Sequence, residues 1–179
     1  MRKKLPINDL SSRHTGLTPA TANYFYEGAR VCLDRHHNSP VDFAIRGDGR
    51  EQVAQVEWVV TDVRTRAAWA NEIDTTEAGA YCVALASVET HLGLVAVRRA
   101  ETLTGADYYI APEGTEPSDL EECLRLEVSG VDAGNQATIE QRLKAKVAQA
   151  EAGKSNLPAV AGVVGFGERL VRVRRVQSS

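Results

Sequence analysis

This sequence lacks several features that would assign it to a class at once. No apolar run approaches the roughly 20 residues that a membrane-spanning helix needs, and the opening MRKKLPINDL has no apolar core of a signal peptide. The 3 cysteines stand singly and without CxxC spacing, as Cys32, Cys82 and Cys123. That pattern favours reduced, buried thiols over disulfides or zinc. We therefore expect a cytoplasmic protein without a membrane partner.

A strong excess of one charge is also missing. The formal net charge is −3, so the whole surface does not have the basic character of a general nucleic-acid binder. The charges are nevertheless segregated, with acid in EGTEPSDLEE (113–122) and base in RLKAK (142–146) and RLVRVRR (169–175). A local basic surface and ordinary solvated helix and strand faces both remain open.

The totals fit one globular domain. A chain of 179 residues with 43% hydrophobic and 25% charged side chains can bury a core without disulfides or structural metals. We expect a single domain over 1–179, in which residues 1–73 extend a core formed by residues 74–175. No repeat or linker interrupts it.

The N-terminal part predicts a helix and a hairpin. Residues 1–17 have no periodicity and are expected to form a loose lead-in. Thr18 is a typical helix cap with Pro19 in the first turn, and an apolar stripe follows at helical spacing, Ala22, Phe25, Ala29, Cys32 and Leu33. Residues 41–47 and 52–70 are rich in β-branched and aromatic side chains and flank GDGREQ, which predicts antiparallel strands joined by a turn.

The rest of the chain alternates between both kinds of element. Asp74 and Glu77 resemble a capping box that opens a helix to about Leu92, and Gly93 closes it. Residues 94–101, 105–112 and 123–130 read as three short strands. A second amphipathic helix is expected over residues 136–152, followed by a last strand or hairpin within AVAGVVGFGERLVRVRRV. The sequence therefore predicts an α/β fold, a mixed sheet flanked by helices.

Three carboxylates stand out because of their positions. Glu89 lies beside the apolar stripe of the first core helix, where an unpaired charge would be costly. Asp107 begins a strand in GADYYIAP. In LRLEVSGVD (124–132), alternation places Leu124, Leu126 and Val128 in a core and Arg125, Glu127 and Ser129 on the opposite face. Each alone is most simply a salt-bridge, turn or exposed strand residue.

Taken in order, helix Glu89, GAD with Asp107 and LEVSG with Glu127 resemble the PD-(D/E)xK nuclease superfamily, whose restriction-endonuclease-like core is α-β-β-β-α-β. The resemblance covers about residues 74–175. It implies a magnesium- or manganese-dependent nuclease acting on DNA. It also implies that Asp107, Glu127 and the carbonyl of Val128 hold the metal, with Glu89 completing or orienting the site.

The chain departs from that family at Ser129, where the family has a lysine two residues after the glutamate. A serine hydroxyl can hydrogen-bond a water but brings no charge to the transition state. Arg142, Lys144 and Lys146 of the next helix could supply the missing cation, and Lys146 is preferred because it flanks the apolar stripe beside Gln149. Glu89, Asp107, Glu127, Ser129 and Lys146 are therefore the predicted catalytic residues.

Two alternatives remain open. The chain could be an inactive relative that serves as a nucleic-acid-binding or protein-interaction subunit, with a protein partner or a second copy completing it, or it could have an unrelated fold. Other signals carry less weight. AGKS (152–155) lacks the first glycine and the strand of a P-loop, GVVGFG (162–167) is followed by no helix, and His36 and His37 fit a helix C-terminus. Tyr108, Tyr109, Trp58 and Trp69 could stack on bases but more simply fill the core.

Overall fold

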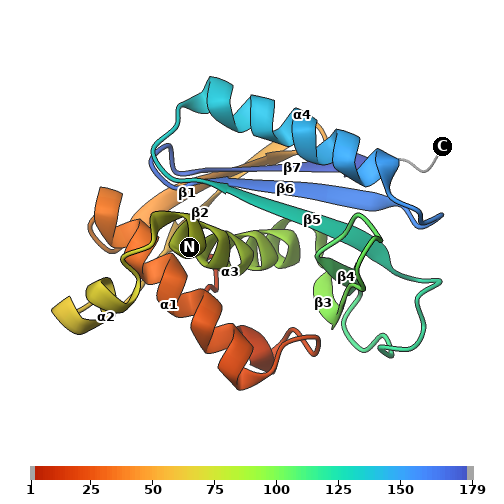
Figure 1. Ribbon diagram of the computed structural model, residues 1–179, viewed down its shortest axis with the longest axis horizontal. Helices are drawn as coiled ribbons and strands as arrows, with labels where there is room; N and C mark the ends of the chain where they lie inside the picture. The colour runs from red at the N-terminus through yellow and green to blue at the C-terminus, as the bar shows by residue number, and fades with distance from the viewer. Residues whose placement is uncertain (1–2, 177–179) are drawn as a thin grey trace.

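The computed structural model describes residues 3–176 and contains one seven-stranded sheet between helices (Figure 1). A short 3-10 helix (η1, Leu10–Ser12) precedes four α-helices, α1 (Pro19–His36), α2 (Val63–Ala68), α3 (Glu72–Leu92) and α4 (Gln136–Ala152). The strands are β1 (Val41–Gly47), β2 (Arg50–Val56), β3 (Val95–Arg99), β4 (Tyr108–Ala111), β5 (Leu124–Val131), β6 (Ala159–Gly165) and β7 (Leu170–Val176).

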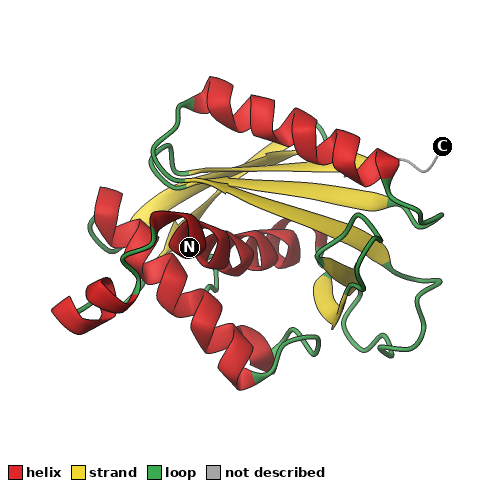
Figure 2. Ribbon diagram, in the orientation of Figure 1, coloured by secondary structure: helices red, strands yellow, loops and turns green. Residues whose placement is uncertain are grey.

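The sheet is mixed. Its strand order is β2-β1-β7-β6-β5-β4-β3, with β1 parallel to β7, β5 parallel to β6 and the other neighbours antiparallel. Helices α1 and α3 lie on one face and α4 lies on the other (Figure 2). The predicted α/β class with a helix-flanked mixed sheet is confirmed. Strands from residues 1–73 and from residues 74–175 belong to the same sheet.

The predicted boundaries of α1 and α4 and the predicted end of α3 are confirmed. Thr18 caps α1 by accepting a hydrogen bond from the backbone N–H of Thr21. Asn135 caps α4 in the same way for Thr138. Gly93 ends α3 in the left-handed region, with φ of 71°, a conformation that costs glycine little.

The predicted capping box at Asp74 is wrong. Helix α3 begins at Glu72, because the side chain of Asn71 accepts hydrogen bonds from the backbone N–H groups of Ile73 and Asp74. Asp74 therefore lies inside the first turn, where its carboxylate still interacts favourably with the helix dipole. The cap was misplaced because Asn71 and Asp74 are equally good capping residues in sequence.

The predicted long strand over residues 52–70 is also wrong. Strand β2 ends at Val56, and Asp62 then caps the short helix α2 by accepting from the N–H of Thr65. Asp34 of α1 holds the intervening loop, because its carboxylate accepts from the indole N–H of Trp58 and from the N–H of Thr61. A contact from a distant helix thus overrides the β-propensity of this segment.

The predicted loose lead-in is packed instead. Leu5, Ile7 and Leu10 are buried in the main core, and the backbone of Leu5 donates to the carbonyl of Gln55 on the edge strand β2. Such a segment shows no periodicity because it follows the sheet as an irregular chain. Residues 1 and 2 of the predicted lead-in lie outside the described residues.

The C-terminal segment forms a hairpin, since β6 and β7 pair in antiparallel fashion from Ala159 with Val176 to Gly165 with Leu170. The aromatic residues considered for base stacking, Tyr108, Tyr109, Trp58 and Trp69, are all buried, which confirms the core interpretation. Within residues 3–176, no helix combines the length and apolarity required to cross a membrane.

Candidate active site

The short strand β4 leaves half of β5 without a neighbour on one side. Strand β4 pairs only with Leu124, Leu126 and the residue between them. Just beyond this ladder, the Asp107 side chain takes the place of a strand, and its Oδ2 accepts a hydrogen bond of 2.8 Å from the N–H of Val128. The backbone groups of a strand residue point to the same side, so the Val128 carbonyl also faces Asp107.

Asp107 is held by Tyr81 and Arg99. The Tyr81 hydroxyl, from α3, donates to Asp107 Oδ1 at 2.7 Å. Arg99 lies 3.8 Å from the same oxygen and stacks over the rings of Tyr81 and Tyr108, with its Cζ 5.1 and 4.8 Å from their centroids. Burial and the nearby Asp107 charge raise the pKa of Tyr81, so this hydroxyl remains a hydrogen-bond donor.

Glu127 is enclosed by α4. Its residue exposure is only 2%. Lys146 Nζ lies 3.0 Å from Glu127 Oε2, and the Gln149 amide donates to Oε1 at 3.2 Å. Burial raises the pKa of Glu127 above its usual range, although the Lys146 hydrogen bond opposes this shift. Asp107 lies close enough to add to the rise.

Glu89 belongs to a different part of the molecule. Its Oε1 accepts from Arg13 Nε at 2.8 Å and its Oε2 lies 3.0 Å from His14 Nε2. Burial alone would raise the pKa of Glu89, but the hydrogen bonds from His14 and Arg13 outweigh it and lower the pKa. The structure therefore does not bring Glu89 to Asp107 and Glu127. It corrects the expectation of three converging carboxylates, because the packed N-terminal segment supplies its partners.

Two cavities meet at Asp107. The first, about 500 Å³, lies between α3 and α4 over the free edge of β5, and we call it the α3–α4 cleft. Its lining includes Ile73, Thr76, Glu77, Ala80, Tyr81, Asp107, Val128, Ser129, Gly130, Arg142 and Lys146. The second, about 550 Å³, is the loop cavity, and it is lined by residues of the 99–107 loop together with Asp107, Glu127, Gln149 and Gly153.

A close approach of α3 to β5 shapes the cleft. A Cβ on Gly130 would lie 2.8 Å from both the side chain and the carbonyl of Thr76. Only glycine accommodates this distance. It brings Glu77 and Tyr81, on the same face of α3, to the strand that carries Glu127. The α3 carboxylates that line the cleft with Asp107 are thus Glu72 and Glu77, and not Glu89.

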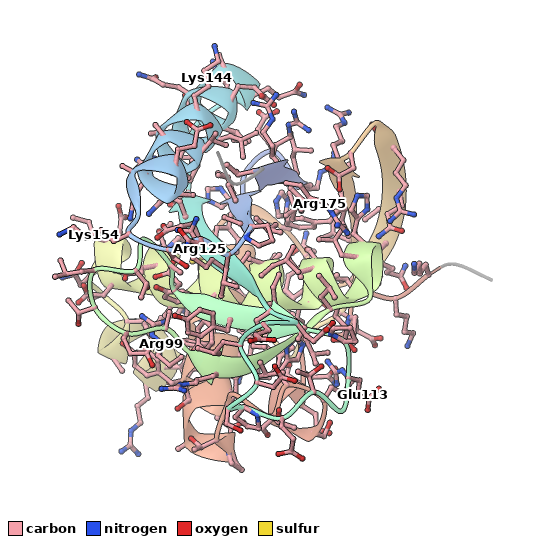
Figure 3. All side chains as sticks on the ribbon, turned by 90° about the vertical axis from the view of Figure 1, so that its right-hand side faces the viewer. Arg99, Glu113, Arg125, Lys144, Lys154 and Arg175 are labelled. Atoms are coloured by element: carbon pink, nitrogen blue, oxygen red, sulfur yellow. The ribbon has the colours of Figure 1, made fainter. Side chains whose placement is uncertain are left out.

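Ser129 and Lys146 both line the α3–α4 cleft. Ser129 is partly buried and lines the cleft on the Glu127 side of β5, and Lys146 approaches Glu127 from α4. Lys144 lies on the outer side of the same helix (Figure 3). The structure thereby separates the candidate cations, since Arg142 and Lys146 line the cleft and Lys144 does not.

The oxygen donors suit magnesium in kind. Asp107, Glu127 and the Val128 carbonyl offer two carboxylates and one main-chain oxygen, and Mg²⁺ is commonly held by one or two carboxylates together with waters and substrate phosphates. Within residues 3–176, no group of three or more His, Cys, Asp or Glu side chains is placed to hold a metal. The residues that could hold such a metal are therefore Asp107 and Glu127 through their side chains and Val128 through its carbonyl.

The sequence interpretation missed Tyr81, Arg99 and Glu77. Glu77 and Tyr81 are four residues apart and so share a helix face, a signal that was hidden when Glu77 was assigned to a capping box. Arg99 gave no signal, because its stacking partners come from α3 and β4. His36, considered for metal binding, lies 2.9 Å from the carboxylate of Asp132.

Comparison of the chain with protein-family models, with curated proteins and with solved structures finds no match.

Proposed function

We propose that this protein is a metal-dependent nuclease that hydrolyses DNA phosphodiester bonds. The observation that carries the proposal is the Asp107 and Glu127 pair, which lines the loop cavity, with Lys146 Nζ 3.0 Å from Glu127. Lys146 would supply the cation that Ser129 cannot. The order α3-β3-β4-β5-α4-β6 supports it, because it repeats the α-β-β-β-α-β succession of the PD-(D/E)xK superfamily.

Each side chain then has a role. Asp107, Glu127 and the Val128 carbonyl would hold magnesium or manganese, which when bound polarises the phosphodiester and activates a water. Tyr81 fixes Asp107 through its 2.7 Å hydrogen bond, and Gln149 fixes one oxygen of Glu127. Partners of this kind orient ligands and tune their basicity. Lys146 offers its ammonium to the charge that develops on the phosphate, and Ser129 offers a hydroxyl to a water.

A non-catalytic, nucleic-acid- or protein-binding module is the second candidate. One observation favours it: both oxygens of Asp107 and both oxygens of Glu127 already accept hydrogen bonds from protein groups. A site satisfied in this way is stable without metal, and a partner subunit could then supply the catalytic groups. The nuclease is expected to bind a divalent metal and the non-catalytic module is not.

The cytoplasmic location stays a prediction.

Cleavage assays test the proposal directly. Wild-type protein and the variants Asp107→Asn, Glu127→Gln and Lys146→Met are incubated with supercoiled, linear and single-stranded DNA and with RNA, in Mg²⁺, Mn²⁺, Ca²⁺ or EDTA. Lys144→Met is the matched control, because it removes the same charge from the outer side of the same helix. Thermal melting establishes that each variant is folded.

We expect metal-dependent DNA cleavage by the wild type and by Lys144→Met, and a loss of at least about a hundredfold in the other variants, as for the removal of a group that stabilises transition-state charge. Absence of cleavage by folded wild-type protein, together with no binding of Mn²⁺ by calorimetry, would reject the nuclease and leave the non-catalytic module.

A further inference from the structure

One stripe of α4 runs past both cavities. Arg142, Lys146 and Gln149 are spaced four and then three residues apart, so they lie on one side of the helix. Arg142 lines the α3–α4 cleft, Gln149 lines the loop cavity, and Lys146 contacts Glu127 between them. The stripe therefore marks a continuous path over the candidate catalytic residues.

Arg142 is the residue of this stripe that has no partner within residues 3–176. Its side chain is exposed, and it makes no hydrogen bond or ion pair within residues 3–176. By contrast, Lys146 is engaged by Glu127 and Gln149. The guanidinium group of an unpaired arginine is well suited to phosphate, because its donors match two phosphate oxygens at once.

The opposite wall of the cleft has another chemistry. It is formed by α3 with the small side chains of Thr76 and Ala80 and with Ile73, which is 78% exposed. The floor is the free edge of β5 beyond Asp107. The same wall also carries Glu72 and Glu77, so the cations that can face a phosphate are those of the α4 wall, Arg142 and Lys146.

We propose that Arg142 binds the backbone phosphate next to the scissile phosphate, so that a DNA strand follows the α4 stripe from the loop cavity into the α3–α4 cleft. This inference rests on the proposed nuclease function. Arg142 and Lys146 are one helical turn apart, roughly 6 Å along the axis. Arg142 can therefore engage one phosphate while Lys146 faces another. Arg142 acts here as a positioning residue.

The acidic groups of the cleft determine how the test is run. Asp132 lies 3.4 Å from Arg35 and 2.9 Å from His36, but Glu72 and Glu77 have no partner within residues 3–176. Without a divalent cation, these carboxylates repel a polyanion. Binding should therefore be measured in Ca²⁺, which occupies oxygen sites, with fluorescently labelled single-stranded and duplex DNA over a range of salt concentrations.

The variants are Arg142→Gln and the matched control Lys144→Gln, which removes a cation from the outer side of the same helix. We expect Arg142→Gln to weaken binding about fivefold, the upper range for an exposed ion pair, and to reduce the slope of log affinity against log salt by about 1. Lys144→Gln should change neither. In Mg²⁺, Arg142→Gln should raise KM for cleavage and leave kcat nearly unchanged, the pattern of lost binding without lost chemistry.

The outcomes separate the two proposals. Equal affinity and equal salt slope for Arg142→Gln and Lys144→Gln, in a protein whose wild type cleaves DNA, would overturn the role of Arg142 alone. A loss of kcat without a change in KM would also overturn it, because Arg142 would then act on the chemistry. Wild-type protein that neither binds nor cleaves DNA would reject the nuclease function, and the inference with it.

Discussion

The ammonium nitrogen of Lys146 lies 3.0 Å from Glu127 Oε2, in a place where Glu127 is almost fully buried. Removal of the lysine would leave a buried carboxylate with Gln149 as its remaining donor. We expect Lys146→Met to lower the free energy of unfolding by about 2 kcal/mol, as for a buried charged group that loses its partner. The loss should grow as the pH rises through the raised pKa of Glu127, since only the ionised form needs the lysine. Urea denaturation across this range measures it.

Lys144→Met is the control for that experiment, and its stability should remain within about 0.5 kcal/mol of wild type, as for a surface substitution. A Lys146→Met protein as stable as wild type at neutral pH would contradict a buried ion pair at this site.

A lysine at position 129 should be able to replace the ammonium group of Lys146. Ser129 and Glu127 lie on the same face of β5, because strand side chains alternate. A lysine at position 129 would thus approach the groups that Lys146 now serves. We expect Ser129→Lys to restore part of the DNA cleavage lost in Lys146→Met, and we expect no such gain from Lys144→Met combined with Ser129→Lys. A double variant that is folded yet as inactive as Lys146→Met would show that position 129 cannot supply the cation.

Two glutamates of α3 should behave in opposite ways. Glu89 is bonded to Arg13 and His14, so Glu89→Gln should lower stability by about 2 kcal/mol without reducing cleavage per folded molecule. Glu77→Gln should reduce cleavage and leave stability unchanged. The pKa of Glu89 is lowered in the folded protein, so its stabilisation is present above the ordinary Glu pKa and is lost as the pH falls through the lowered value. The stability difference between wild type and Glu89→Gln should therefore shrink on acidification.

Tyr81 should affect metal affinity by orienting Asp107. Tyr81→Phe keeps the ring over which Arg99 stacks and removes the hydroxyl that donates to Asp107. Loss of such an orienting partner commonly costs between tenfold and a hundredfold in metal affinity or activity. We expect a reduction of about tenfold in Mn²⁺ affinity by calorimetry, and an unchanged affinity would exclude Asp107 as an oriented metal ligand.

Gly130 should be intolerant of a methyl group. Its Cβ would lie 2.8 Å from Thr76, so Gly130→Ala must push α3 away from β5 and should lower stability by about 2 kcal/mol, as overpacking does. Gly162 offers a matched control on the neighbouring strand β6, because the nearest atom to its added Cβ is 3.7 Å away. Gly162→Ala should cost less in urea denaturation, and equal losses would contradict the close approach of α3 at Gly130.

The sequence by itself determined the elements whose signals are local. The caps of α1 and α4, the glycine end of α3, the core strands and the opposed faces of β5 follow from capping chemistry and periodicity, which depend on neighbours within one turn or one strand. The same local reasoning put Glu127 and Lys146 forward as site residues. It failed where a residue had two plausible local uses, as with Asp74 and Glu77.

Only the tertiary structure decided which groups meet. Residues 57–70 lie outside the sheet because the Asp34 carboxylate accepts hydrogen bonds from Trp58 and Thr61. Glu89 lies outside the candidate site because it pairs with Arg13 and His14, which come from a segment more than 70 residues earlier in the chain. Lys146 reached Glu127 because α4 crosses the face of β5 opposite α3. Contacts between residues far apart in the chain follow from packing, and local periodicity does not predict them.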